Sequence, residues 1–507
     1  MYKIKNYLLM LAALFTIFVA ACSNSSSEPI EPNLSVPADL LSNGLNFEMQ
    51  KGEQNFSIKA NIKPEVSSEK SWCKINPAAE STAETYKYTV SVEENTETRI
   101  RTSLITVKAG DITKTFEVKQ QAKISPPSTE ENEAQAFTKS LGLGWNLGNQ
   151  LDASDNEVAN ETAWGNPLAT QVTFNKLAEI GITSVRIPIT WLGKVGEAPE
   201  YAIDQKWLNR VAECVGYAEK AGLKVIINIH HDGSESKYWL DIKNAAKSES
   251  INQKVKAQLQ AMWKQIAERF KDKGEFLMFE SMNEIQDGGW GWGDNLKDGG
   301  KQYAVLNEWN QIFVDVVRNV GGENSKRYLG IPGYSTNPDL TISNLILPRD
   351  PANHLMISVH YYDPYKYAIA DEFSEWGHTG TVGKKDPNVS EEQVKKTFGN
   401  LKTAFIDKGI PVYIGEMGAV HRNNARAETF RKYYIEYVFK AARTYGLAPF
   451  YWDNGSNGTG NECFGIIDHG TGNFINNGQE IIETMKKAVL SEDASYTLET
   501  VYNNAPN

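Results

Sequence analysis

The chain has 507 residues, of which 41% are hydrophobic and 23% are charged, an ordinary composition for a globular protein. This length exceeds what one compact core usually accommodates, so we expect two domains together with a leader or a tail. The formal net charge of -11 and the lack of any block of lysines and arginines argue against nucleic acid as a partner, whereas a neutral polymer is compatible with this charge.

Residues 1–21 have the features of a signal peptide. Two early lysines precede an apolar stretch that is too short for a comfortable membrane span, and small residues follow it. The stretch Val19-Ala20-Ala21-Cys22 resembles a bacterial lipobox, in which the cysteine becomes the lipidated first residue of the mature protein. We therefore expect a lipoprotein signal peptide and lipidation at Cys22, with plain secretion as the alternative.

The segment after the leader predicts how the chain is attached. Residues 22–38 are rich in Ser, Pro and Glu, and we expect a flexible tether. No later segment is apolar enough to span a bilayer, so the membrane would be reached through the lipid anchor only. Ser23 stands where an aspartate would favour the inner membrane. We expect an outer-membrane lipoprotein exposed at the cell surface, with the periplasmic face as the alternative.

Residues 39–122 show short alternating runs of apolar and polar residues, which predict a small all-β sandwich. Through "SWCKINP" at 71–77 and the closing "FEVKQQA", the segment resembles the BACON domains of Bacteroidetes polysaccharide-degrading lipoproteins. The resemblance implies either a carbohydrate-binding module or a spacer. Trp72 is a candidate sugar platform, but a lone Trp followed by Cys in a sandwich is more often part of the core.

After a linker at 123–135, residues 136–490 alternate between strand-like and helix-like patterns, followed by a C-terminal tail at 491–507. The eight candidate strands are 142–147, 182–187, 224–229, 276–282, 328–332, 355–361, 411–416 and 448–452. Amphipathic segments separate most of them. The fold class predicted is therefore α/β, a (β/α)8 TIM barrel preceded by the sandwich.

The residues at the carboxyl ends of these strands carry chemistry, as a barrel enzyme requires. Polar and aromatic side chains of the kind that handle a sugar end seven of the eight strands, with one glutamate each on the fourth and the seventh, Glu284 and Glu416. Two carboxylates across a barrel mouth are the minimum equipment for cleaving a glycosidic bond. If they stand roughly 5 to 5.5 Å apart, no water fits between them and one must act as nucleophile.

Residues 136–490 resemble a family 5 glycoside hydrolase. The motifs "GWNLGNQLDA" at 144–153 and "ETAWGNP" at 161–167 resemble its subfamily 4, which contains endoglucanases, xyloglucanases and mixed-linkage glucanases. The resemblance implies that Glu284 is the general acid/base and Glu416 the nucleophile. The remaining invariant positions of the family match Arg186, His230, His360, Tyr362 and Trp452. Ile285 and Met417 depart from the family pattern, but neither replaces a reacting group.

The expected roles follow from the residue types. Arg186 would keep Glu416 ionised through charge-assisted hydrogen bonds, whereas partial burial and the charge of Glu416 would raise the pKa of Glu284. Asn283 supplies an amide for the sugar 2-hydroxyl. Tyr362 lies two residues after His360, so both project from one face of a strand towards the nucleophile.

Several further side chains are candidates for the substrate site. Trp452 offers an apolar floor for the ring before the scissile bond, His231 lies at the end of the third strand, and Asn149 follows the first. For Trp290 and Trp292, in the loop after Glu284, substrate stacking and plain loop packing stay equally open. Trp239 and Trp376 are expected in loops at the same face.

The sequence predicts neither a metal nor a cofactor. The "HHDG" stretch at 230–233 suggests metal ligands, but no further histidine has a matching spacing and the chemistry needs none. The cysteines outside the leader, Cys73, Cys214 and Cys463, show no paired spacing that would indicate a zinc module or a disulfide framework. Glu280, deeper in the fourth strand, is interpreted as a buried and paired structural carboxylate.

Together these features predict a monomeric surface lipoprotein with a retaining endo-β-1,4-glucanase barrel. Its expected partner is a β-glucan chain such as xyloglucan, mixed-linkage glucan or a cellulose-type polymer. One alternative keeps the mechanism but acts on xylan or mannan. The other is a non-catalytic glycan-binding lipoprotein, although both glutamates that this alternative would be expected to lose are present.

Overall fold

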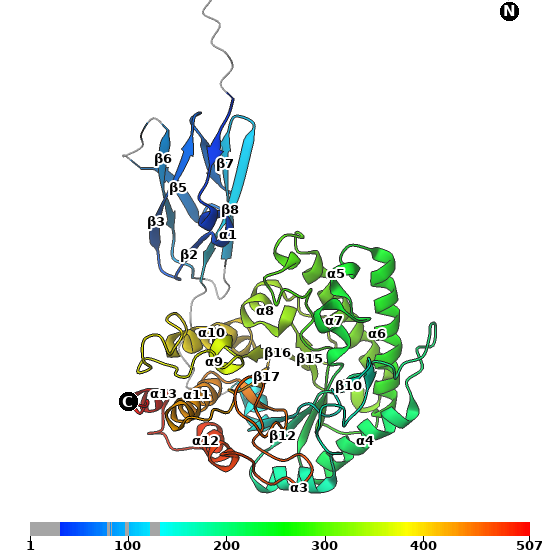
Figure 1. The fold of residues 1–507 in the computed structure, drawn as a ribbon. Helices are drawn as coiled ribbons and strands as arrows, with labels where there is room; N and C mark the ends of the chain where they lie inside the picture. The colour runs from blue at the N-terminus through cyan, green and yellow to red at the C-terminus, as the bar shows by residue number, and fades with distance from the viewer. Residues whose placement is uncertain (1–30, 79–81, 83, 97–100, 122–131) are drawn as a thin grey trace, which may run out of the picture. The chain divides into compact units, whose positions relative to one another are not determined.

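The computed structural model describes residues 31–78, 82, 84–96, 101–121 and 132–507. The predicted signal peptide, Cys22, the tether up to residue 30 and most of the predicted linker lie outside these residues. The chain divides into two compact units, an N-terminal one and a larger C-terminal one (Figure 1). Within the described part of the chain, no helix combines the length and the hydropathy needed to cross a bilayer.

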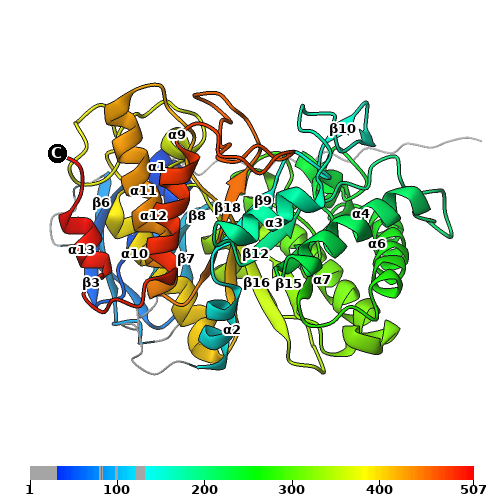
Figure 2. The same cartoon turned by 90° about the horizontal axis from the view of Figure 1, so that it is seen from below.

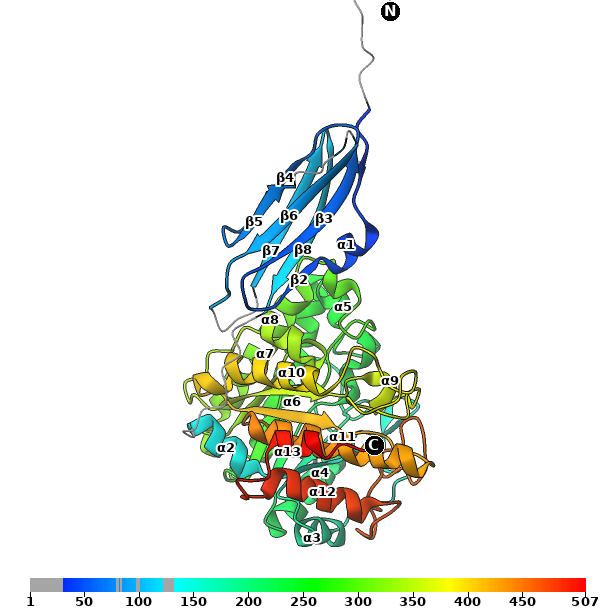
Figure 3. The same ribbon diagram turned by 90° about the vertical axis from the view of Figure 1, so that its left-hand side faces the viewer.

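The N-terminal unit is a β-sandwich, as predicted (Figure 3). Its first sheet has the order β1-β3-β6-β5 and its second the order β2-β8-β7-β4. The elements are β1 (Leu34–Ser35), α1 (Ala38–Asn43), β2 (Leu45–Phe47), β3 (Gly52–Ala60), β4 (Glu65–Ser68), β5 (Cys73–Pro77), β6 (Thr85–Val92), β7 (Arg101–Ala109) and β8 (Ile112–Gln120). Inward residues such as Val90, Val107 and Val118 alternate with outward ones and form one core.

Two details correct or refine the prediction for this unit. Residues 34 and 35 already pair antiparallel with β3, so the sandwich begins within the segment expected to be tether. The physical reason is Leu34, which is buried and finds a place in the core. Trp72 is partly buried and packs against the same core, which favours the packing role over a sugar platform.

The C-terminal unit is a closed parallel barrel in the order β12-β13-β14-β15-β16-β17-β18-β9. Each strand falls on one of the predicted segments: β9 (Gly144–Leu147), β12 (Ser184–Ile187), β13 (Lys224–Ile227), β14 (Leu277–Glu280), β15 (Leu329–Pro332), β16 (Leu355–Tyr361), β17 (Val412–Met417) and β18 (Ala448–Asp453). All eight are almost completely buried, because the helices cover their outer face and side chains fill the inside.

Helices surround this barrel (Figures 1 and 2). They are α3 (Gln171–Glu179), α4 (Gln205–Lys220), α5 (Ile242–Ala245), α6 (Glu249–Arg269), α7 (Lys301–Val320), α8 (Pro338–Asn344), α9 (Tyr365–Ala368), α10 (Glu391–Ala404), α11 (Ala425–Thr444) and α12 (Gly478–Leu490), with a short hairpin of β10 (Ser154–Asp155) and β11 (Val158–Ala159) after β9. The apolar stripes predicted within α6 and α11 face the core, where Leu259, Trp263 and Tyr434 are fully buried.

Among the described residues, five 3-10 helices complete the loops. They are η1 (His231–Ser236), η2 (Asp294–Leu296), η3 (Gly322–Ser325), η4 (Tyr334–Thr336) and η5 (Ile406–Lys408). Of these, η1 begins directly at one of the predicted site histidines and so fixes the backbone at the mouth of the barrel.

Both ends of the barrel domain extend further than predicted. Helix α2 (Glu133–Leu141) starts inside the expected linker because Asn132 and Gln135 form a capping box. Beyond the predicted end, residues expected to form a tail include α13 (Leu498–Asn503), which lies against α11 (Figure 3). Val501 is buried in the barrel core, so this part of the predicted tail packs against the barrel.

Candidate active site

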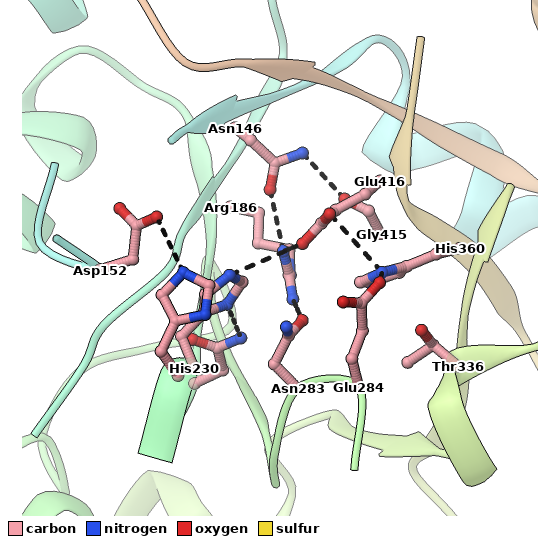
Figure 4. Close-up of polar contacts among 12 residues, drawn as sticks. Asn146, Asp152, Arg186, His230, Asn283, Glu284, Thr336, His360, Gly415 and Glu416 are labelled. Carbon is pink, nitrogen blue, oxygen red and sulfur yellow. Dashed lines mark hydrogen bonds and ion pairs between the residues drawn. The ribbon is translucent and has the colours of Figure 1, made fainter. Parts of the chain in front are cut away.

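Polar side chains gather at the carboxyl end of the barrel (Figure 4). Arg186 is on β12, His360 on β16 and Glu416 on β17, while Asn283 and Glu284 follow the end of β14. The structure thus brings together the side chains that the sequence predicts at the ends of four different strands.

Arg186 is the hub of these contacts. It is fully buried and donates from Nε to Glu280 Oε2 at 2.7 Å. Its Nη1 donates to Glu416 Oε1 at 2.8 Å and to Asn146 Oδ1 at 3.0 Å, and its Nη2 donates to Asn283 Oδ1 at 2.7 Å. Four partners hold the guanidinium in one position, so it can in turn hold the carboxylate of Glu416 and the amide of Asn283.

Glu280 has the structural role predicted for it. Besides the contact with Arg186, it accepts hydrogen bonds from Ser358 Oγ at 2.6 Å and from Asn228 Nδ2 at 3.1 Å. It is fully buried beneath the mouth of the barrel, and Arg186 lowers the pKa of its carboxyl enough to overcome the opposing effect of burial. Glu280 is therefore a charged support beneath the reacting groups.

The two carboxylates at the mouth share one imidazole. His360 Nδ1 lies 2.7 Å from Glu284 Oε1 and 3.6 Å from Glu416 Oε2. One ligand atom from each of the three side chains lies within 4.8 Å of the others. Burial opposes protonation of His360, but the charges of Glu416 and Glu284 outweigh burial and raise the pKa of the imidazole.

A bulge in β17 sets this arrangement. Along β16 and β17 the pairing passes from Val359 opposite Ile414 to His360 opposite Glu416, so Gly415 is the extra residue. A Cβ atom on Gly415 would lie 3.1 Å from His360 Nε2, and its carbonyl accepts a hydrogen bond from Asn146 Nδ2 at 2.8 Å. The glycine lets the imidazole approach β17 closely while the bulge directs Glu416 towards it.

Opposing influences act on the pKa of Glu416. The predicted contact with Arg186 exists, but burial raises the pKa of the Glu416 carboxyl above its ordinary value. His360 and Arg186 act in the opposite direction and do not fully compensate, and Glu284 adds to the rise. The depth of burial, which the sequence does not reveal, decides this balance.

Both carboxylate oxygens of Glu416 accept a hydrogen bond. Tyr362 donates its hydroxyl to Oε2 at 3.2 Å, as its spacing from His360 predicted, and Arg186 binds Oε1. Burial and the nearby carboxylates raise the pKa of Tyr362 far above its ordinary value, so its hydroxyl keeps its proton and remains a donor. The carboxylate cannot rotate without losing one of these two contacts.

His230 adds a neutral imidazole next to Glu416, with Nε2 3.8 Å from Oε1. Asn228 Oδ1 accepts the backbone N–H of Ile189, which orients its Nδ2 to donate to His230 Nδ1 at 3.1 Å. The proton of His230 therefore resides on Nε2. Burial, assisted by the positive charge of His231 and Arg186, lowers the pKa of His230, so the ring stays neutral.

Glu284 has an uncommon backbone. Its φ angle of 43° lies in the left-handed region, which residues other than glycine adopt rarely. Such conformations persist where the surrounding structure enforces them, and they cluster at functional sites. Here the backbone N–H of the preceding Asn283 donates to Ile229 O at 2.9 Å and ties this turn to the neighbouring strand.

A cleft of about 500 Å³ opens beside these groups. Among the predicted residues it is lined by Asn149, His231 and Trp452, and the ring of Trp452 lies parallel to that of His230 with centroids 6.0 Å apart. Trp164 and Glu462, which were not predicted as site residues, also line the cleft. Trp164 could have been predicted from its place in the motif "ETAWGNP", whereas no sequence pattern indicates a role for Glu462.

The loop tryptophans separate into two groups. Trp376 is fully buried against Tyr434, and Trp239 donates to Asp232 Oδ1 at 2.7 Å, so both serve loop packing. Trp290 and Trp292 are 52% and 82% exposed. They lie in the loop that directly follows Glu284.

Hydrogen bonds within the loop of Trp290 and Trp292 stabilise it. Gln286 Oε1 accepts the backbone N–H of Trp290 at 3.0 Å, and Asp287 accepts those of Gly289 and Asn295. The two exposed indoles are thus presented by an ordered turn. Their substrate contact stays a prediction.

Besides the group of Glu284, His360 and Glu416, a second cluster among the described residues has the composition of a metal site. Ligand atoms of Asp152, His230 and His231 lie within 4.8 Å of one another. However, Asp152 accepts the backbone N–H groups of Asn149 and Gln150 at 3.0 and 2.6 Å, so the loop itself already uses both of its oxygens. These bonds account for a buried carboxylate at this position without an ion, and the absence of a metal stays a prediction.

Comparisons with known proteins agree with this geometry. Residues 151–458 match the family described as cellulase, glycosyl hydrolase family 5, and residues 39–123 match a viral BACON domain. A GH5-4 broad specificity endoglucanase from Bacteroides salanitronis is 58% identical, with a TM-score of 0.70 over 73% of this chain and 99% of that chain. A Bacteroidetes-affiliated GH5 cellulase linked with a polysaccharide utilization locus is 51% identical, with a TM-score of 0.73 over 74% and 98%.

A relative of similar total length was also found. The xyloglucan-specific endo-beta-1,4-glucanase of Bacteroides ovatus is 31% identical over 480 residues, which covers 89% of this chain and 92% of that protein. The family match covers most of the barrel and more than half of the chain. The chain therefore belongs to glycosyl hydrolase family 5, and its barrel is that of a glycoside hydrolase.

Proposed function

We propose that the chain is a retaining endo-β-1,4-glucanase. The observation that supports this most strongly is the closeness of Glu284 and Glu416, whose nearest oxygens lie within 4.8 Å and contact the same imidazole of His360. A pair this close leaves no room for the water that an inverting enzyme places between its carboxyl groups, which are roughly 6.5–9.5 Å apart.

In the first step, the Glu416 carboxylate attacks the anomeric carbon and the bond to the leaving oxygen breaks. Glu284 gives its proton to that oxygen, and a covalent glycosyl-enzyme forms. Arg186 and Tyr362 hold the two oxygens of Glu416 in the direction of attack. The Nδ2 of Asn283, whose Oδ1 is bound by Arg186, is free among the described residues to bind the sugar 2-hydroxyl.

In the second step, Glu284 acts as base. It takes a proton from a water that attacks the anomeric carbon, and Glu416 leaves as a carboxylate. The sugar that carries this carbon lies over Trp452, while Asn149, His231 and Trp164 contact the rings before it. Trp290 and Trp292, presented after Glu284, would contact rings on the leaving-group side.

For substrate we propose neutral β-1,4-linked glucan chains, with xyloglucan, mixed-linkage glucan and cellulose-type polymers as the candidates. The names of the relatives support this, since they include a broad specificity endoglucanase and a xyloglucan-specific endo-beta-1,4-glucanase. Xylan and mannan are the competing backbones with the same mechanism.

Product analysis on xyloglucan, mixed-linkage glucan, carboxymethylcellulose, xylan and mannan in parallel tests the proposal. We expect internal cleavage of the glucans, with retained anomeric configuration in the first product. Activity confined to xylan or mannan would overturn the substrate assignment. If Glu416→Ala and the parent protein bound glucan equally and were equally inactive on every polymer, the protein would be a binding module instead.

We further propose that the protein is a monomer and an outer-membrane lipoprotein anchored through Cys22. The lipobox-like sequence and the Ser-rich segment after it support the anchor. Metabolic labelling with a radioactive fatty acid should mark the parent protein and not the Cys22→Ala variant. Equal recovery of both proteins in the culture medium would show plain secretion instead.

A further inference from the structure

The loop after β18 places a third carboxylate over the cleft. Asn454 closes this loop, since its Oδ1 accepts the backbone N–H groups of Ser456 and Phe464 at 3.2 and 3.3 Å. Its Nδ2 donates to the backbone oxygen of Glu462 at 2.6 Å. The side chain of Glu462 then lines the cleft together with Trp452.

The backbone of Glu462 is in a left-handed conformation, which residues with a side chain rarely adopt. Its φ angle is 58°, and the other left-handed positions of this loop, Gly455 and Gly460, are glycines. A glutamate in the left-handed region is uncommon and persists only where the surrounding structure enforces it, which points to a role for the side chain. Its carboxylate makes no hydrogen bond or ion pair with any residue that the structure describes, so it offers its charge to the cleft.

Negative charge dominates this part of the cleft. Burial within the cleft raises the pKa of Glu462, and the charges of Glu416 and Glu284 raise it further. None of the described residues that line the cleft is a lysine or an arginine, and the one base among them is His231, whose imidazole lies 3.7 Å from its own counter-charge on Asp152.

We propose that Glu462 makes the cleft selective for neutral glycan chains, because its carboxylate repels anionic substituents on the sugars bound between Trp164 and Trp452. This inference rests on the proposed function and extends it from the backbone of the substrate to its charge. The substrate class is unsubstituted β-glucan or glucan with neutral side chains. The disfavoured class, cleaved with a lower kcat/KM, is glycan that carries carboxylates, such as carboxymethylated glucan or chains with uronic acid branches.

The test compares two soluble celluloses that differ in charge and not in bulk, neutral hydroxyethylcellulose and anionic carboxymethylcellulose. In the full chain, Glu462→Gln keeps the size of the side chain and removes the charge. We expect this variant to raise the ratio of kcat/KM on carboxymethylcellulose to kcat/KM on hydroxyethylcellulose about five-fold, the effect of one close charge pair partly exposed to water. Added salt should raise the ratio of the parent and leave that of the variant nearly unchanged.

Glu483→Gln is the matched control, because it removes the same charge from an exposed site on α12 away from the cleft. It should leave the ratio unchanged. An equal ratio in the parent and Glu462→Gln, or an equal loss on both polymers, would overturn the inference while the proposed function stands. If the parent cleaved neither polymer, the proposed function would fail by itself. Calorimetric affinities for both polymers in the Glu416→Ala background would then decide the inference by the same ratio.

Discussion

At the scale of single residues, the site works by assigning different surroundings to two identical side chains. Glu416 is buried and bound by Arg186 and Tyr362, whereas the side chain of Glu284 is 23% exposed and contacts His360. A nucleophile benefits from a fixed position, and a group that gives and takes a proton benefits from access to water and to the leaving oxygen. The roles proposed for the two glutamates follow from this difference.

The first prediction concerns the proton donor. Glu284→Ala should lower kcat on mixed-linkage glucan by about 10²- to 10⁴-fold, because the sugar leaving group needs its proton. The loss in the first step should be much smaller on an aryl cellobioside whose phenol leaves without protonation, and a burst of phenol should precede slow turnover. Stopped-flow absorbance measures the burst. Equal losses on both substrates without a burst would contradict the proton-donor role.

A second prediction concerns pH. His360 lowers the pKa of Glu416 by its positive charge, so His360→Gln should raise that pKa further. Since the proposed mechanism requires Glu416 as a carboxylate, the acidic limb of the profile of kcat/KM against pH should move to higher pH. His354→Gln, just before the opposite end of β16, is the control and should leave the limb in place. A limb that moves to lower pH in His360→Gln would refute this account.

At the scale of elements, a single bulge decides whether the ends of two strands form one site. The extra residue in β17 brings Glu416 opposite His360, and Gly415 leaves room for the imidazole. Without the bulge, alternation along the strand would direct the next side chain to the other face. The position of Glu416 therefore depends on a neighbour that has no side chain.

We accordingly predict that Gly415→Ala displaces His360 by a few tenths of an ångström and lowers kcat on mixed-linkage glucan about ten-fold. Gly216→Ala is the matched control. Gly216 lies inside α4, where an added Cβ meets no atom within 4 Å, so this change should raise the free energy of unfolding by about 0.5–1 kcal/mol and leave kcat unchanged. Chemical denaturation and initial rates measure both effects, and full activity in Gly415→Ala would contradict the role of the bulge.

The barrel strands could be predicted from the sequence, whereas the bulge and part of the loop residues could not. All eight barrel strands were predictable because burial on both faces leaves continuous apolar runs that end in polar residues. The bulge at Gly415 was not, since one extra residue leaves no mark on hydrophobic periodicity. Trp164 and Glu462 were not predicted as site residues because both lie in loops, and closure of the second loop through Asn454 brings Glu462 to the cleft.

At the scale of the whole molecule, the two units have separate hydrophobic cores. The core of the sandwich includes Val90 and Val107, and the barrel core is built from residues of 134 and beyond. Each core is large enough for its own domain, and the residues proposed for catalysis all belong to the barrel. Catalysis should therefore depend on the barrel alone.

The last prediction tests this independence. A protein of residues 132–507 should fold and cleave soluble mixed-linkage glucan with a kcat/KM within about two-fold of the full chain. Pull-down on insoluble cellulose, compared for the two proteins, shows whether the sandwich binds glycan or is a spacer. A large loss of activity on the soluble substrate would show that the sandwich takes part in the cleft.

The pairing of Arg186 with two carboxylates has an evolutionary consequence. One buried guanidinium serves two carboxylates, Glu280 from below and Glu416 from above. If Glu416 mutates to a neutral residue, Arg186 keeps Glu280 as a partner and no buried cation is left unpaired, whereas loss of Glu280 would remove its deeper partner. A duplicated gene can thus lose catalysis through a single codon and still encode a folded barrel with an intact cleft. If Glu416 is the nucleophile as proposed, a catalytically inactive descendant that still folds is one substitution away, and only selection on activity would keep this glutamate in place.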